Sequence, residues 1–169
     1  MKGRMAWAGA IALLGILAAG AAYVVRAASW RVVGARAVGR EPVLKPDYAG
    51  TIVPPNIAPL RFRVVEPGRR YVVRFSGAYG RPLCVRSADG RIRTPLGPWR
   101  TLAAANAGGR LLVDVAVLTP RGWEQFEPVT LRIAKEPVDR YLVYRQIGPV
   151  FNLSEYMSIR ERDLQSFED

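Results

Sequence analysis

Apolar and polar residues alternate in several short runs, and this period of two is the feature that most restricts the fold. Residues 60–64, 71–76 and 111–117 follow the alternation, and Asp89-Gly90 between two short runs predicts a hairpin. Alternation places one set of side chains on a buried face of a sheet and the other set in solvent. We therefore expect an all-β fold with six or seven short strands in a single antiparallel β-sandwich of the immunoglobulin or fibronectin III type.

An uncharged segment of 21 residues runs from Met5 to Val25, with two basic residues before it and Arg26 after it. As a helix it spans about 30 Å, which is the thickness of the hydrocarbon core of a bilayer. Two interpretations stay open: an uncleaved transmembrane signal anchor, which we favour, and a signal helix that is cleaved after Ala22. Both place the rest of the chain outside the cytoplasm.

The pattern of glycine, proline and charge suggests four parts. They are a signal anchor or signal peptide (1–26), a spacer (27–50), the β-sandwich domain (51–147) and a tail with a short helix (148–169). The helix in the tail is expected from a candidate cap at residues 154–157 and from the spacing of Ile159, Asp163, Leu164 and Phe167. No helix is expected between residues 51 and 140, because no apolar stripe with a helical period is evident there.

A net charge of +11 is typical of proteins that bind nucleic acid, but we do not expect nucleic-acid binding here. Of the 25 basic residues 22 are arginine, and those in the β region alternate with apolar residues, as on the solvent face of a one-sided sheet. An exported protein rarely meets nucleic acid. The expected partners are therefore the membrane, through residues 5–25, and an envelope protein or polysaccharide at an anionic surface.

The residues that most enzymes need are missing. The chain has no histidine and one cysteine, which excludes Ser-His and Cys-His nucleophile pairs, an internal disulfide and multi-cysteine metal centres. We expect no catalytic, cofactor-binding or metal-binding residue, and Cys84 is expected to be a small packed side chain. An enzyme of unrecognised type would need Asp114, Glu124 and Glu127 to converge in one pocket.

Aromatic residues are the best candidates for ligand binding. Trp99 and Trp123 each follow a glycine-containing loop, and together with Tyr79 they could form a platform on which sugar rings stack. Alternatively, each tryptophan fills one end of a small core, and we favour this interpretation.

Three segments resemble the N-terminal module of bacterial envelope proteins that carry a TolB-like β-propeller. They are Asp47 to Phe62, with its Pro-Pro-Asn-Ile-Ala-Pro-Leu string, Glu136 to Arg145, and Ser158 to Glu168. In that family a Cys-x-x-Cys-His element and the propeller blades follow, and this sequence ends before both. The resemblance implies a free-standing module or the front part of a longer protein, and no haem-type or propeller residue can be assigned.

These observations predict a membrane-anchored, exported, non-catalytic β-sandwich that acts as a binding or scaffold module. Its location would be the cell membrane, with a single span and the body in the periplasm or at the cell surface. Two alternatives are a carbohydrate-binding module that uses the loop tryptophans and an enzyme of unrecognised type.

Overall fold

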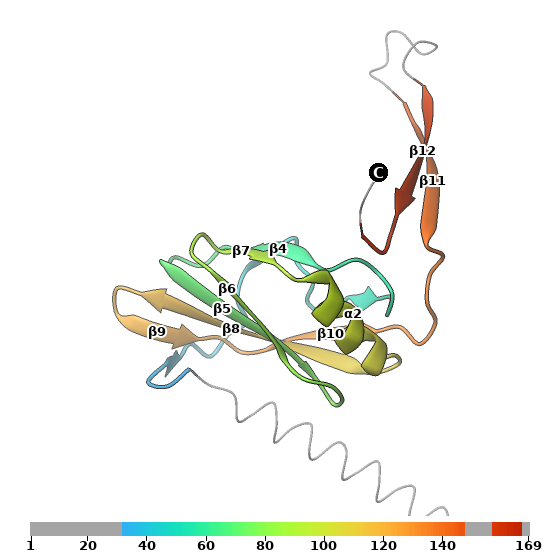
Figure 1. Ribbon diagram of the computed structural model, residues 1–169. Helices are drawn as coiled ribbons and strands as arrows, with labels where there is room; N and C mark the ends of the chain where they lie inside the picture. The colour runs from blue at the N-terminus through green and yellow to red at the C-terminus, as the bar shows by residue number, and fades with distance from the viewer. Residues whose placement is uncertain (1–31, 148–156, 167–169) are drawn as a thin grey trace, which may run out of the picture.

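The computed structural model describes residues 32–147 and 157–166, and the apolar segment 5–25 lies outside them. Within the described part, strands form three sheets with one helix between them, so the prediction of an all-β chain is confirmed (Figure 1). A search of these same residues finds no helix with the length and apolar character needed to cross a bilayer.

The largest sheet has seven strands and is built around the ten-residue strand β8 (Arg110–Thr119). Along one edge of β8 runs β5 (Arg70–Gly77), which pairs on its other side with β6 (Leu83–Ser87). The other edge is shared end to end by β9 (Gly122–Gln125) and β10 (Val129–Ile133). All of these pairs are antiparallel, as the alternation predicted.

Two short strands join this sheet in parallel, which the sequence pattern did not predict. They are β1 (Arg36–Ala37), which pairs with β9, and β3 (Ile52–Val53), which pairs with β10. A two-residue strand carries no readable alternation. Its pairing is decided by the edge it meets, so the local sequence gives no signal for it.

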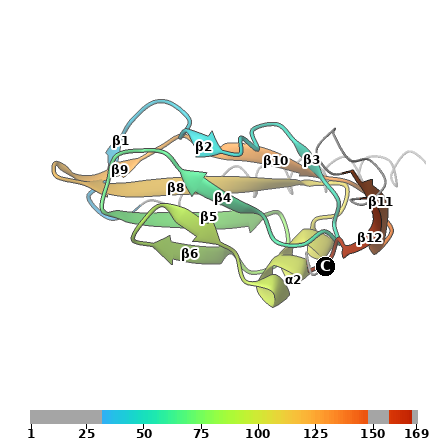
Figure 2. The ribbon, with the colours of Figure 1, turned by 90° about the horizontal axis from the view of Figure 1, so that it is seen from above.

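A second sheet of three strands contains β2 (Leu44–Lys45), β4 (Arg61–Val64) and β7 (Arg91–Arg93), with β4 in the middle. It lies over one face of the larger sheet (Figure 2). The contact is apolar, and the rings of Phe62 and Phe75 meet edge to face across it at 6.2 Å. One core therefore lies between the two sheets.

The expected spacer, residues 27–50, forms strands and core contacts where it is described, from residue 32 onward. It contributes β1 and β2, and Leu44 is buried in the core. The Arg40 guanidinium donates two hydrogen bonds of 2.7 Å to the carboxylate of Glu66, which also accepts one from the Val43 N–H at 2.8 Å. The bonds from Arg40 hold the pKa of Glu66 below its ordinary value. This segment is bound to the body and is not a linker.

Helix α2 (Leu96–Ala105) corrects the expectation that residues 51–140 hold no helix. Trp99, Leu102 and Ala103 are buried on one side of it, at the i, i+3, i+4 spacing of an amphipathic helix. Pro98 lies in the first turn, where its missing N–H costs nothing. The signal was present, but the glycine and prolines before it looked like a loop.

Asn106 ends α2 and ties it to the turn after β5. Its side-chain amide donates to the carbonyls of Leu102 (2.8 Å) and Tyr79 (2.9 Å), and its oxygen accepts from the Tyr79 N–H (3.1 Å). Gly77 lies so close that a Cβ there would come within 2.3 Å of the Asn106 side-chain oxygen. Glycine is therefore required at the end of β5.

The third sheet is a hairpin of β11 (Tyr141–Gln146) and β12 (Ser158–Asp163) that stands apart from the two packed sheets (Figure 1). Two expectations are corrected here. The strand predicted near residue 141 is present, but it pairs with β12 in a sheet of its own and not with the sandwich strands, and residues 158–163 of the tail form a strand instead of a short helix. Six cross-strand pairs stabilise β12, whereas a short helix with no surface to pack against would be marginal.

Candidate functional site

The outer face of the three-stranded sheet carries five basic residues, which we call the basic face: Lys45, Arg61, Arg63, Arg91 and Arg93. Phe62, Val64 and Ile92 point into the core, so the residues that alternate with them face solvent, and all five are exposed. The sequence analysis predicted this solvent face from the alternation. It did not predict how the arginines on different strands are aligned.

The register places the basic residues directly opposite one another. Lys45 pairs with Arg63 and Arg63 pairs with Arg91, which makes a row of three cations across three strands. Arg61 and Arg93 form a second row. The strand spacing is about 5 Å and the rows are about 7 Å apart, so five positive charges share a small area.

Like charges directly opposite on neighbouring strands are unfavourable for the folded state. Among the described residues only Arg91 of the basic face has an acidic neighbour, Asp89, with 3.8 Å between Nε and Oδ2. One comparable pair, Arg110 opposite Arg132, lies on the outer face of the larger sheet. The basic face differs because it extends the arrangement to three strands and two rows.

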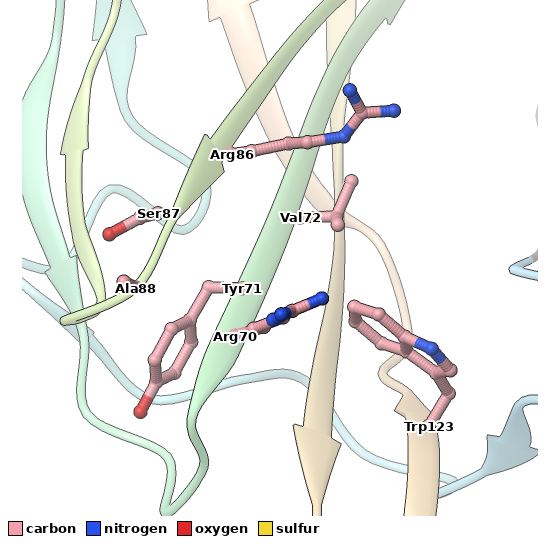
Figure 3. A pocket seen from close by; sticks show the side chains of 7 residues that line it. All are labelled: Arg70, Tyr71, Val72, Arg86, Ser87, Ala88 and Trp123. Atoms are coloured by element: carbon pink, nitrogen blue, oxygen red, sulfur yellow. The ribbon is translucent and has the colours of Figure 1, made fainter.

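A groove lies on the outer face of the larger sheet, with a volume of about 400 Å³ (Figure 3). It is lined by two guanidinium groups, one indole and apolar side chains, and among the described residues no acidic side chain lines it. Its lining residues are Arg70, Tyr71, Val72, Arg86, Ser87, Ala88 and Trp123. Arg86 pairs with Val72, and Trp123 pairs with Leu118, which lies opposite Arg70. The groove can therefore accept an anionic group beside an aromatic surface.

The turn that joins β6 to β7 runs from a strand that lines the groove to a strand of the basic face, and these surfaces are the outer faces of different sheets. Arg86 and Ser87 end β6 in the groove, and Arg91 begins β7 on the basic face. The carboxylate of Asp89 in the turn accepts hydrogen bonds from the Ser87 hydroxyl (2.9 Å) and the Arg91 N–H (3.1 Å). These bonds lower the pKa of Asp89, and the bond from the Arg91 N–H has the largest effect. The predicted hairpin at Asp89-Gly90 is therefore wrong: a turn forms there, but β6 pairs with β5 and β7 pairs with β4, so the turn joins two different sheets.

The three aromatic residues proposed as one platform lie in three different places. Trp99 is fully buried in α2, where its indole N–H donates to the Ile57 carbonyl at 3.0 Å. Tyr79 is 62% exposed, but it follows the Gly77 end of β5, whereas Trp123 lies near the Arg70 end. Trp99 therefore fills the core, and only Trp123 lines the groove.

The acidic residues of the enzymatic alternative do not converge. Asp114 is buried on the outer face of β8, 3.3 Å from the Arg74 guanidinium, and burial raises its pKa to about 6 against the attraction of Arg74. Glu124 pairs with Val117, whose side chain faces the core, and binds Arg36 at 2.6 Å on the opposite side of the sheet from Asp114. Glu127 is exposed.

Two further observations concern reactive and metal-binding groups. Cys84 is exposed on β6 opposite Arg74, and not packed as expected, because it alternates with the buried Val85. In the described ranges no cluster of three or more cysteine or carboxylate residues could hold a metal ion.

Comparisons with protein families, with curated proteins and with solved structures find no match. The resemblance to the module of TolB-like propeller proteins therefore stays a prediction. What the fold and the site define together is a class of molecule, an all-β chain that presents a basic face and a basic groove with an exposed aromatic edge.

Proposed function

We propose that this chain is a membrane-anchored, exported, non-catalytic binding module that holds an acidic polysaccharide of the cell envelope on its basic face. The observation that carries this proposal is the row of Lys45, Arg63 and Arg91 across three strands, with Arg61 and Arg93 behind it. A fold that keeps like charges opposite one another gains most when an anion lies between them.

An extended polymer fits this surface better than a small anion does. The five basic residues are spread over the outer face of three strands, so one compact anion would reach only a few of them. Uronic acid residues repeat a carboxylate along a chain, and each guanidinium can bind a carboxylate through two parallel hydrogen bonds. Spacings of about 5 Å and about 7 Å between cations suit such a repeated charge.

The location in this proposal comes from the sequence. Residues 5–25 would anchor the chain in the cell membrane, with the body in the periplasm or at the cell surface. The two packed sheets support an immunoglobulin-like or fibronectin III-like β-sandwich. In this proposal the chain serves as an N-terminal module of the kind that precedes a TolB-like propeller and holds envelope material close to the membrane.

Neutralising one cross-strand pair of the basic face should weaken binding without weakening the fold. For Arg61→Gln/Arg93→Gln we expect the affinity of the full chain for polygalacturonate to fall about tenfold, while the free energy of unfolding stays unchanged or rises by about 0.2–1 kcal/mol because a like-charge pair is removed. Binding is measured by retention on immobilised polygalacturonate in a neutral detergent, and stability by urea unfolding.

The matched control removes the same two charges from the other sheet. Arg110→Gln/Arg132→Gln also neutralises two opposed, exposed arginines and should leave most of the affinity intact. Equal losses in the two double variants would mean that net charge alone attracts the polymer, and the basic face would then not be a site.

A second function, contact with the sugar rings themselves, is favoured by the position of Trp123 in the groove. Its indole lies beside Arg70 and Val72, so a ring could stack on it while Arg86 binds a carboxylate (Figure 3). We expect Trp123→Ala to lower the affinity for acidic oligosaccharides about three- to tenfold, including at high salt, where charge contacts are screened.

Tyr79→Ala is the control for this variant, because Tyr79 is an exposed aromatic residue at the opposite end of β5. Its affinity should equal that of the unmodified chain. Should Trp123→Ala bind as tightly as the unmodified chain at high salt, the groove would have no part in binding.

A further inference from the structure

The hairpin of β11 and β12 exposes an unusual amount of apolar surface. Seven of the fourteen large apolar residues that are exposed in the described part of the chain lie in its two strands or directly beside them, with Val143 at 60% and Ile159 at 81%. All six residues of β11 are exposed. A two-stranded sheet on its own is marginally stable, and an exposed apolar surface of this kind is suited to contact with another chain. The seven residues are Tyr141, Leu142, Val143, Tyr144, Ile147, Met157 and Ile159.

The two edges of the hairpin differ in chemistry. Strand β12 carries four consecutive charged residues, Arg160 to Asp163, which is a common way to prevent edge-to-edge pairing. Strand β11 carries one charge, Arg145, after four apolar or aromatic residues. Among the described residues β11 pairs only with β12, so its other edge has free N–H and C=O groups. Each strand of the hairpin therefore has an open edge, and the edge on β11 is the one without a run of charged residues.

We propose that a second copy of this chain pairs with β11 in antiparallel orientation, so that two hairpins form one four-stranded sheet. A two-fold axis perpendicular to the sheet requires one residue to lie opposite itself, and Val143 is the residue that fits. Leu142 then lies opposite Tyr144 of the second copy, and Tyr141 lies opposite Arg145. The contacts are apolar at the centre, with a cation–π contact at each end.

Charge is what favours the second copy on β11 and opposes it on β12. Centred on Val143, the register places no charged residue opposite another. The same symmetry on β12 would place Arg160, Glu161 or Arg162 opposite itself, and each choice sets like charges together. Self-pairing is thus directed to one edge, and the pairing closes as a dimer because it is isologous.

The interface is small, so the dimer should be weak. One pair of six-residue strands buries less than a standard protein interface of about 1,600 Å², and we expect a dissociation constant on the order of micromolar. The measurement therefore needs the full chain at about 100 times that concentration, in a neutral detergent, with mass read by native mass spectrometry. A dimer would have twice the 18.7 kDa of one chain.

The variant Val143→Lys tests this pairing without harming the hairpin. Val143 lies opposite Glu161 within the hairpin, so a lysine there gains an ion pair in the single chain and meets a second lysine in the dimer. We expect the dissociation constant to rise more than tenfold. The control Ile159→Glu makes a similar change on β12, opposite Arg145, and should dimerise like the unmodified chain. A monomeric unmodified chain, or an undiminished dimer for Val143→Lys, would overturn the proposal.

Cross-linking gives a second, independent readout of the register. In a Cys84→Ser background, Val143→Cys should form a disulfide-linked dimer under mild oxidation, since residue 143 of each copy lies opposite the other. Glu161→Cys, on the charged edge, should not. A cross-link through residue 161 that matches or exceeds the one through residue 143 would place the second copy on the wrong edge.

Discussion

Trp99→Ala is expected to lower the free energy of unfolding by about 3–5 kcal/mol, which is the usual cost of removing a buried tryptophan. The Trp99 side chain is fully buried, and its ring meets Phe75 edge to face at 5.7 Å. The loss includes this contact, the hydrogen bond to the Ile57 carbonyl and the cavity that remains. Urea unfolding followed by circular dichroism measures it, because the fluorescence of the variant itself changes.

Trp99→Phe separates packing from the hydrogen bond. It keeps most of the ring contact with Phe75 and loses the indole N–H, so we expect a smaller cost of about 1–2 kcal/mol, partly from the unpaired Ile57 carbonyl. If the free energy of unfolding of Trp99→Ala were within about 1 kcal/mol of that of the unmodified chain, Trp99 would not be a core residue. The interpretation of Trp99 as a ligand platform would then regain support.

Arg74→Met is the second substitution with a large expected effect, about 3 kcal/mol of destabilisation at pH 8. Arg74 and Asp114 are both buried on the outer face of the larger sheet, and their side chains are 3.3 Å apart. Without the guanidinium the Asp114 carboxylate is left buried without this charge beside it. Arg36→Met, which breaks the exposed ion pair with Glu124, is the control and should cost less than about 1 kcal/mol.

The cost of Arg74→Met should depend on pH. Burial already raises the pKa of Asp114 to about 6, so this group lowers stability as pH rises from 3.8 toward 6. Removal of Arg74 takes away an attraction that lowers this pKa, and the pKa then rises further. Near pH 5 the carboxyl is mostly protonated in both folded proteins, so the destabilisation should shrink there. A cost that is equal at pH 5 and pH 8 would contradict the assignment of Asp114 as the group responsible.

Strands with clear alternation could be predicted from the sequence, and short or cooperative elements could not. The runs at 60–64, 71–76 and 111–117 correspond to β4, β5 and β8, because each has enough residues for a period of two to be visible. The strands β1 to β3 have two residues each and exist only because longer strands present an edge to them. Strand β12 in the tail forms for the same reason, because it pairs with the edge of β11.

The candidate site shows the same division. Alternation indicated that Arg61, Arg63, Arg91 and Arg93 face solvent, but the row that they form with Lys45 depends on the register of three strands far apart in the sequence. Similarly, Trp99 and Trp123 stand after similar glycine-containing segments, and only the packing of α2 buries one and leaves the other in the groove. Local sequence determines the face of a residue, whereas its neighbours come from tertiary pairing.

The measurement that tests acidic polysaccharide binding most directly is isothermal titration calorimetry of the full chain, in a neutral detergent, with oligogalacturonate and with a neutral oligosaccharide of equal length. We predict saturable binding of the acidic ligand only, weakened about tenfold between 50 and 200 mM salt. If the heat of binding is lost in the variant Arg61→Gln/Arg93→Gln, the ligand lies on the basic face. Absence of binding at low salt, or equal affinity for the neutral and acidic ligands, would contradict the proposed function.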